Sequence, residues 1–120
     1  VASFGGFVEG DAAVAVPSTV APSENDVVVT KRRVSAFSGS DLDVILRGIQ
    51  AENLVLAGVA TSGVVLSTLR QAADLDYRLT VLHDLCLDPN PEVHSCLVDK
   101  VFPRQAEVVS LDQWVAGLAK

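Results

Sequence analysis

The chain has 120 residues, of which 49% are apolar and 20% are charged, so it forms one domain at most and can bury a sizeable core. Nine basic residues against 15 acidic ones give a net charge of -6, which argues against a nucleic-acid surface, because such a surface must neutralise phosphates. No apolar run approaches the roughly 20 residues that span a bilayer, and the first residues lack a signal pattern. We therefore expect a cytoplasmic protein with no nucleic-acid partner and no membrane partner.

The N-terminal residues 1–26 show no helical periodicity. Glycine and proline interrupt them at five positions: Gly5, Gly6, Gly10, Pro17 and Pro22. Such residues are typical of a loop or an extended segment. The β-branched run from Val27 to Thr30 follows, and because such residues suit a buried strand, we expect the first strand there.

Short apolar runs without alternation predict three further strands, at 54–57, 77–82 and 106–110. Apolar residues at helical spacing predict helices at about 42–49, 64–75, 91–101 and 111–118. Capping signals begin three of these helices: Ser40 with Asp43, Asn90 with Pro91, and Ser110 with Gln113. The alternation of strand and helix predicts an α/β fold, a doubly wound parallel sheet flanked by helices in a Rossmann-like three-layer arrangement.

Ligands of such folds bind beyond the carboxyl ends of the strands. The residues that leave those ends are Lys31 to Arg33, Gly58 to Val64, His83 to Cys86, and Ser110. Neither GxGxxG nor GxxxxGK[ST] nor GxSxG occurs there, so the sequence supports no dinucleotide, P-loop or serine-hydrolase site. The two thiols, Cys86 and Cys96, form no CxxC pair and have no His pair at ligand spacing, and we expect both to be small buried hydrophobic residues. No metal and no cofactor is expected.

Two stretches resemble a known family, the isochorismatase-like cysteine hydrolases of the nicotinamidase/isochorismatase superfamily. They are "DVVVTKRRVSAFSGSDLDVILRGIQAENLVLAGVATSGVVLSTLRQAADLDYRLTVLHD", residues 26–84, and "PEVHSCLVDKVFPRQAEVVSLDQW", residues 91–114. The resemblance implies a pocket at the carboxyl edge of the sheet, where members hydrolyse amides or the vinyl ether of isochorismate. It also implies that 1–120 is the C-terminal part of a single isochorismatase-like domain that lacks the first strands of the family fold.

The resemblance carries over only one member of the catalytic triad of Asp, Lys and Cys. Lys31 matches the Lys, although a snorkelling surface lysine is the alternative. The family Cys lies six residues after the Gly of "GVAT", which is Val64 here, a residue without a nucleophilic atom. The family Asp ends a first strand that has no counterpart, and Asp11, in a Gly-rich loop, does not match it. Phe37 of "SAF" matches an aromatic residue that walls the pocket, with core packing as the alternative.

The resemblance also concerns the backbone and hydroxyls of the turn. It implies a non-proline cis bond between Val59 and Ala60, and an oxyanion hole made by the amides of Ala60 and Val64. Thr61 and Ser62 are expected to offer hydroxyls to the pocket. A serine nucleophile needs an adjacent base, and a pair of Ser62 with His83 is the candidate, with a cap serine and a loop histidine as the alternative.

Two functions remain open at this point. One is an isochorismatase-family hydrolase-like protein that acts on or binds a small amide or isochorismate-like metabolite, with Val64 in place of the nucleophile. The other is a non-catalytic member that binds a small molecule or forms an oligomer. Because a strand at 27–30 lacks a neighbour in the chain, buried amides there would be unpaired, and we expect a homo-oligomer.

Overall fold

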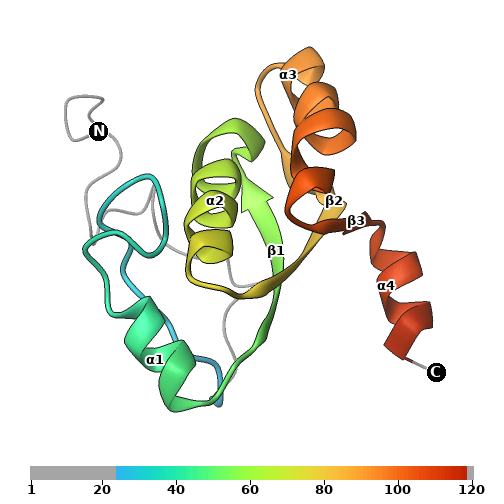
Figure 1. The fold of residues 1–120 in the computed structure, drawn as a ribbon. Coiled ribbons are helices and arrows are strands. Elements are labelled where there is room, and N and C mark those ends of the chain that lie inside the picture. The colour runs from blue at the N-terminus through green and yellow to red at the C-terminus, as the bar shows by residue number, and fades with distance from the viewer. Residues whose placement is uncertain (1–23, 119–120) are drawn as a thin grey trace.

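The computed structural model describes residues 24–118, so most of the predicted N-terminal loop, 1–26, lies outside the described residues. Helices and strands alternate along the described chain (Figure 1). In chain order they are α1 (Leu42–Gly48), β1 (Asn53–Val59), a π-helical turn (Thr61–Val65), α2 (Leu66–Asp74), β2 (Arg78–Leu87), α3 (Pro91–Cys96), a second π-helical turn (Leu97–Val101), a 3-10 turn (Phe102–Arg104), β3 (Glu107–Val109) and α4 (Leu111–Leu118).

The three strands of the described chain form one parallel sheet in the order β1-β2-β3. This confirms the predicted strands at 54–57, 77–82 and 106–110 and the α/β fold class. The pairing of β1 with β2 shifts along its length: Leu56 lies opposite Val81, but Gly58 lies opposite Cys86. The bulge lengthens β2 beyond its predicted end and brings Cys86 beside the carboxyl end of β1.

The predicted strand from Val27 to Thr30 is wrong. These residues have no regular secondary structure, and the side chains of Val27 and Val28 are 62% and 67% exposed. A β-branched run becomes a strand only when neighbouring strands satisfy its backbone groups. Among residues 24–118, no strand pairs with this run.

Two of the three predicted helix caps are confirmed. The side chain of Asn90 accepts the backbone N–H groups of Glu92 and Val93 at 3.0 and 3.3 Å, with Pro91 in the first turn of α3. Ser110 and Gln113 form the reciprocal bonds of a capping box, with Ser110 Oγ accepting at 3.1 Å and Gln113 Oε1 accepting at 2.8 Å.

The capping box predicted for Ser40 and Asp43 is wrong. Ser40 Oγ donates to the carbonyl of Ala36 at 2.6 Å and accepts the amide of Leu42 at 3.3 Å. The Asp43 carboxylate instead accepts the hydroxyl of Tyr77 at 2.6 Å. The local pattern assigned the Asp43 carboxylate to the N-terminus of the helix, but in the folded chain it accepts a hydrogen bond from Tyr77, which is distant in the sequence.

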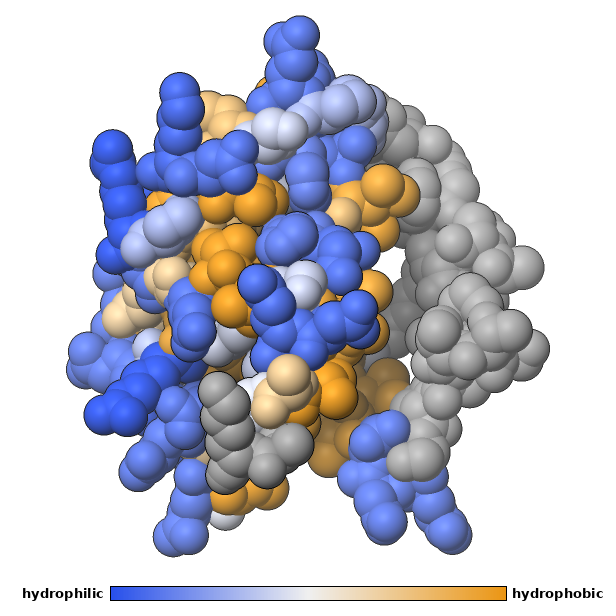
Figure 2. All heavy atoms as spheres, turned by 90° about the vertical axis from the view of Figure 1, so that its right-hand side faces the viewer, coloured by the Kyte–Doolittle hydropathy of each residue, from blue (hydrophilic) through white to orange (hydrophobic). Residues whose placement is uncertain are grey.

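The core lies between α2 and the sheet, where Thr68, Leu69 and Ala72 of α2 are buried together with Val65 of the preceding turn. Phe102 and Val81 are also fully buried in this cluster. Elsewhere, apolar side chains remain exposed, among them Val55 and Val59 of β1 and Val115 and Leu118 of α4. Figure 2 shows hydrophobic residues reaching the surface between hydrophilic ones on one face.

Candidate active site at the turn between β1 and α2

The chain turns sharply where β1 ends. Gly58 has φ of +139°, a value that residues with a side chain rarely adopt. The peptide bond from Val59 to Ala60 is cis, at the position that the family resemblance implies. The Ala60 carbonyl then accepts the amides of Gly63 and Val65 at 3.1 and 3.2 Å, which begins the π-helical turn that leads into α2. These bonds set the direction in which the helix leaves the sheet edge.

Val64 lies in this turn, two residues before the first residue of α2. Its side chain is half-buried and packs against the core cluster. That Val64 occupies a nucleophile position, with its amide and that of Ala60 forming an oxyanion hole, stays a prediction.

Within residues 24–118, neither Lys31 nor Phe37 forms a hydrogen bond with this turn. Lys31 is exposed, and its ammonium donates to the carbonyl of Arg33. Phe37 is buried and its ring stacks on Tyr77, with the centroids 6.0 Å apart. The neighbouring Ala36 amide donates to Thr68 Oγ1 at 2.9 Å, so the "SAF" segment is attached to α2. Core packing, the alternative for Phe37, therefore describes the contacts that its ring makes here.

The two hydroxyls of the turn have partners that sequence reasoning did not assign. Thr61 is fully buried, and a hydrogen bond of 2.8 Å joins its Oγ1 to Nδ1 of His94. Ser62 donates its amide and its hydroxyl to the same carboxylate oxygen, Oδ1 of Asp88, at 2.8 and 2.6 Å. The candidate pair of Ser62 with His83 is therefore wrong, because the serine hydroxyl donates to Asp88, and His83 lies within β2 rather than in a loop.

These hydrogen bonds act on the acidity of Asp88. Its pKa lies below the ordinary value because the Ser62 hydroxyl, and then the Ser62 and Asn90 amides, stabilise the carboxylate, with a smaller contribution from His94. A carboxylate with a lowered pKa is a weaker base. It therefore accepts the Ser62 proton in a hydrogen bond but does not activate that serine as a nucleophile at neutral pH.

Asp88, but not His94 on α3, could have been found from the topology that the sequence predicts. Carboxyl ends of adjacent parallel strands meet at one edge of the sheet, so a polar residue that follows the second strand faces the turn that follows the first. The predicted end of that strand at 82 stopped short of this edge, because the bulge extends β2 to Leu87.

The two cysteines differ in exposure. Cys86 is buried opposite Gly58, as predicted, whereas Cys96 is exposed on α3 and the prediction of a buried thiol is wrong there. Burial raises the pKa of Cys86, with a nearby charge on Asp84 acting in the same direction, while a hydrogen bond with the Gly58 backbone lowers it. The α3 helix exposes Cys96 because Leu97, the next residue, is the one that enters the core.

We predict that a thiol reagent labels the two cysteines at very different rates in the native chain. Cys96 should be labelled at pH 7.5 before the first timed quench. Cys86 should be labelled only when the pH rises above the ordinary thiol pKa of about 8.5, because the thiolate is the reactive species and the pKa of Cys86 is raised in the folded chain. Peptide mass spectrometry after timed quenching assigns each site, and labelling in denaturant serves as the control. Equal rates at pH 7.5 would contradict the burial of Cys86.

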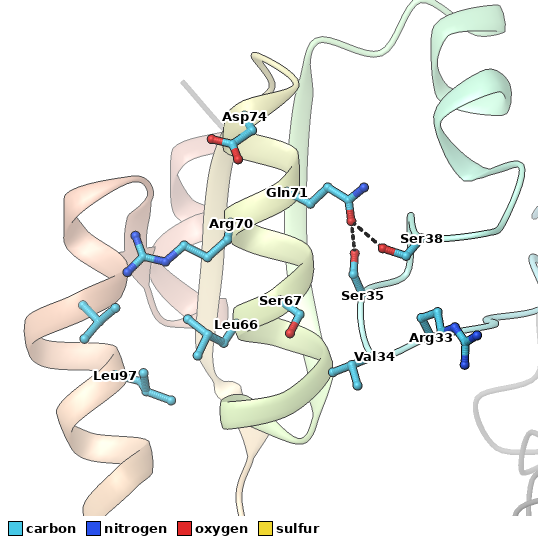
Figure 3. A pocket seen from close by; sticks show the side chains of 11 residues that line it. Arg33, Val34, Ser35, Ser38, Leu66, Ser67, Arg70, Gln71, Asp74 and Leu97 are labelled. Atoms are coloured by element: carbon cyan, nitrogen blue, oxygen red, sulfur yellow. Dashed lines mark hydrogen bonds between the residues drawn. The ribbon is translucent and has the colours of Figure 1, made fainter. Parts of the chain in front are cut away.

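A groove of about 870 Å³ runs along the outer side of α2 (Figure 3). One wall is the segment 33–38, where Ser35 and Ser38 donate to Gln71 Oε1 at 2.6 and 3.0 Å, and Leu97 lies on the other side. None of its lining residues belongs to the turn 59–65. The groove is therefore separate from the candidate site.

The described part of the chain contains no candidate metal site and no candidate membrane-spanning helix. Within residues 24–118, no three His, Cys, Asp or Glu side chains lie close enough together to hold a metal ion. None of the helices in that part of the chain has the length and hydropathy needed to cross a membrane.

A parallel sheet whose first strand ends in a cis peptide and passes directly into a helix defines an α/β protein with its candidate site at the carboxyl edge. The chain belongs to the isochorismatase family, since the sequence model described as the Isochorismatase domain matches residues 5–113. This confirms the resemblance drawn from the sequence.

Individual relatives agree with this membership. YecD of Escherichia coli O157:H7, named an uncharacterized isochorismatase family protein, is 32% identical over 102 residues, which cover 85% of this chain and 54% of YecD. YwoC of Bacillus subtilis, named likewise, is 36% identical over 99 residues, covering 82% and 52%. The ureidoacrylate amidohydrolase RutB of Stutzerimonas stutzeri is 35% identical over 107 residues, covering 87% and 40%. The chain thus spans about half the length of the curated relatives it matches.

Solved structures show the same fold. An isochorismatase family protein from Burkholderia thailandensis superposes with a TM-score of 0.85 at 32% identity, covering 88% of this chain and 56% of the other. An isochorismatase-like hydrolase from Alkaliphilus metalliredigens superposes with a TM-score of 0.88 at 28% identity, covering 93% and 62%. The described elements therefore correspond to part of the family fold.

Proposed function

We propose that the chain binds a small amide or isochorismate-like metabolite at the turn 59–65, as a hydrolase-like member of its family that does not use a thiol nucleophile. The observation that carries the proposal is Val64, a side chain without a nucleophilic atom in the turn that leads into α2. Neither cysteine replaces it, because Cys86 is buried in β2 and Cys96 is exposed on α3.

The groups around the turn also restrict the chemistry. The Thr61 hydroxyl is fully buried and bonded to His94, so it is not accessible to a ligand. The Ser62 hydroxyl is accessible, but its partner Asp88 is a weak base. Chemistry at this turn would then use water or a proton, and hydrolysis of a vinyl ether can proceed by protonation without a covalent intermediate. Amides belong to the proposal because RutB, 35% identical, is named as an amidohydrolase.

The test combines binding and turnover with purified chain. Nicotinamide, ureidoacrylate and isochorismate are titrated by calorimetry, and release of ammonia from the amides or pyruvate from isochorismate is followed. We expect saturable binding of at least one compound, and any turnover should persist in the double variant Cys86→Ala, Cys96→Ala. Val64→Trp should abolish the binding by filling the turn, whereas the control Val115→Trp, on the exposed side of α4, should not. Absence of saturable binding, or turnover that is lost in a folded double variant without either cysteine, would refute the proposal.

A non-catalytic, oligomer-forming member is the second candidate, and a separate observation favours it. Val55 and Val59 of β1 are 41% and 66% exposed on a strand that has a neighbour on only one side among the described residues. Exposed apolar edge strands promote association. Light scattering at increasing concentration tests it: a homo-oligomer is expected, and a monomer at all concentrations would exclude it.

A further inference from the structure

Asp88 holds the candidate turn from the side of β2. This carboxylate follows β2 directly, and its Oδ1 accepts both the amide and the hydroxyl of Ser62, at 2.8 and 2.6 Å. Its second oxygen, Oδ2, accepts the amide of Asn90 at 3.1 Å. One side chain therefore joins the turn after β1 to the residue that caps α3.

His94 holds the same turn from the side of α3. The helix begins at the Asn90 cap, and the Asn90 carbonyl accepts the His94 amide at 3.0 Å. One helical turn after the cap, the His94 ring meets the buried Thr61 hydroxyl at 2.8 Å. Thr61 and Ser62 are consecutive, so the bonds close a ring that runs from the turn through Asp88, Asn90 and His94 and back to the turn.

We propose that Asp88 and His94 are positioning residues that fix the turn 59–65 through Ser62 and Thr61. The inference rests on the proposed function in so far as that turn is taken as the ligand site. Neither side chain needs to touch a ligand for this role. Each anchors one of two consecutive residues, so the pair fixes both the place and the rotation of the backbone that follows the cis bond.

The strength of the two anchors follows from their chemistry. Hydrogen bonds to a charged acceptor are about twice as strong as neutral ones, and Asp88 accepts three of them. The lowered pKa of Asp88 agrees with this, because the bonds stabilise its charged form. The Thr61 hydroxyl has no access to water, so losing the His94 nitrogen would leave a buried polar group unpaired.

Amide hydrogen exchange of Gly63 and Val65 tests the Asp88 anchor. These amides bond the Ala60 carbonyl and do not touch Asp88 or His94, so they report the turn itself. Asp88→Ala should accelerate their exchange about tenfold by favouring local opening. Asp88→Asn should restore most of the protection, because its carbonyl oxygen can accept both Ser62 bonds, although it carries no more charge than alanine.

Asp43→Ala is the matched control, since Asp43 also accepts a side-chain hydroxyl at 2.6 Å, from Tyr77, but at a distant site. It should leave the exchange of Gly63 and Val65 unchanged. The Asp88 anchor is overturned if Asp88→Ala does not accelerate exchange, if Asp88→Asn is as damaging as Asp88→Ala, or if Asp43→Ala has the same effect at the turn.

The His94 anchor is tested in the same way with His94→Asn and His94→Ala. In His94→Asn, the side-chain amide lies near the position of Nδ1, so the bond to Thr61 and the exchange protection of Gly63 and Val65 should be kept. In His94→Ala, the two amides should exchange about tenfold faster. If His94→Ala fails to fold, Thr61→Val, which keeps the side-chain shape without the hydroxyl, decides the point through the same amides. Because exchange is measured without ligand, a failure of ligand binding refutes only the proposed function, and unchanged exchange refutes only the anchors.

Discussion

Replacing Phe102 with alanine should lower the free energy of unfolding by about 3 to 5 kcal/mol, the range for large aromatic side chains removed from a core. The Phe102 side chain is fully buried, in the same cluster as Leu69, Val81 and Leu97. Its backbone carbonyl also accepts the amides of Gln105 and Ala106 at 3.0 and 2.9 Å, which fixes the 3-10 turn before β3. A cavity at this point would therefore loosen the contact between the helical layer and the last strand.

Chemical denaturation followed by circular dichroism measures this loss. Phe102→Leu, which refills part of the cavity, should lose less than half as much. The control is Leu118→Ala on α4, a side chain that is 66% exposed, and it should change stability by about 0.5 kcal/mol or less. If Phe102→Ala were no more destabilising than Leu118→Ala, the cluster around Phe102 would not be the core of the protein in solution.

The sequence predicts the sheet well where strand formation is a local property. The runs at 54–57, 77–82 and 106–110 are mainly apolar, and each forms a strand in the structure because neighbouring chain segments pair with it. The run at 27–30 has a similar composition and fails, because no described strand pairs with it. Strand propensity marks candidates, while the available neighbours decide among them.

The helix caps also show which features depend on local sequence and which depend on tertiary contacts. Asn90 and Ser110 form the caps that their spacing predicts, because within residues 24–118 their side-chain oxygens bond only the amides of their own helices. Asp43 does not, because Tyr77, the residue before β2, reaches it across 34 residues of chain. A capping pattern describes two residues of one helix and contains no information on such a competitor.

The candidate site was predictable in its location but not in its polar contacts. Periodicity and the family resemblance placed the turn at the end of the strand 54–57, and the cis bond from Val59 to Ala60 lies there. The partners of Thr61 and Ser62 depend on how far β2 continues past its bulge and on where α3 begins, so His94 and Asp88 could not be assigned from local patterns.

Replacing Val64 with cysteine should create a thiol that is labelled at pH 6, at least about tenfold faster than the exposed Cys96 of the same chain. The reason is electrostatic. Position 64 lies in the turn that leads into α2, where the helix dipole stabilises an anion and lowers a thiol pKa by about one unit or more. Because the pKa is lowered, the advantage over Cys96 should shrink as the pH rises through the ordinary thiol range.

Rates of labelling between pH 5 and 9, assigned by peptide mass spectrometry, measure this effect. Val65→Cys is the matched control, because Val65 is adjacent but only 3% exposed, and its thiol should stay unlabelled at pH 6. The half-buried Val64 side chain packs against the core, and burial would oppose the dipole by raising the pKa. If the thiol of Val64→Cys were as unreactive as that of Val65→Cys, this packing would prevail over the dipole. Val64 would then be a core residue, and the family nucleophile would not correspond to this position.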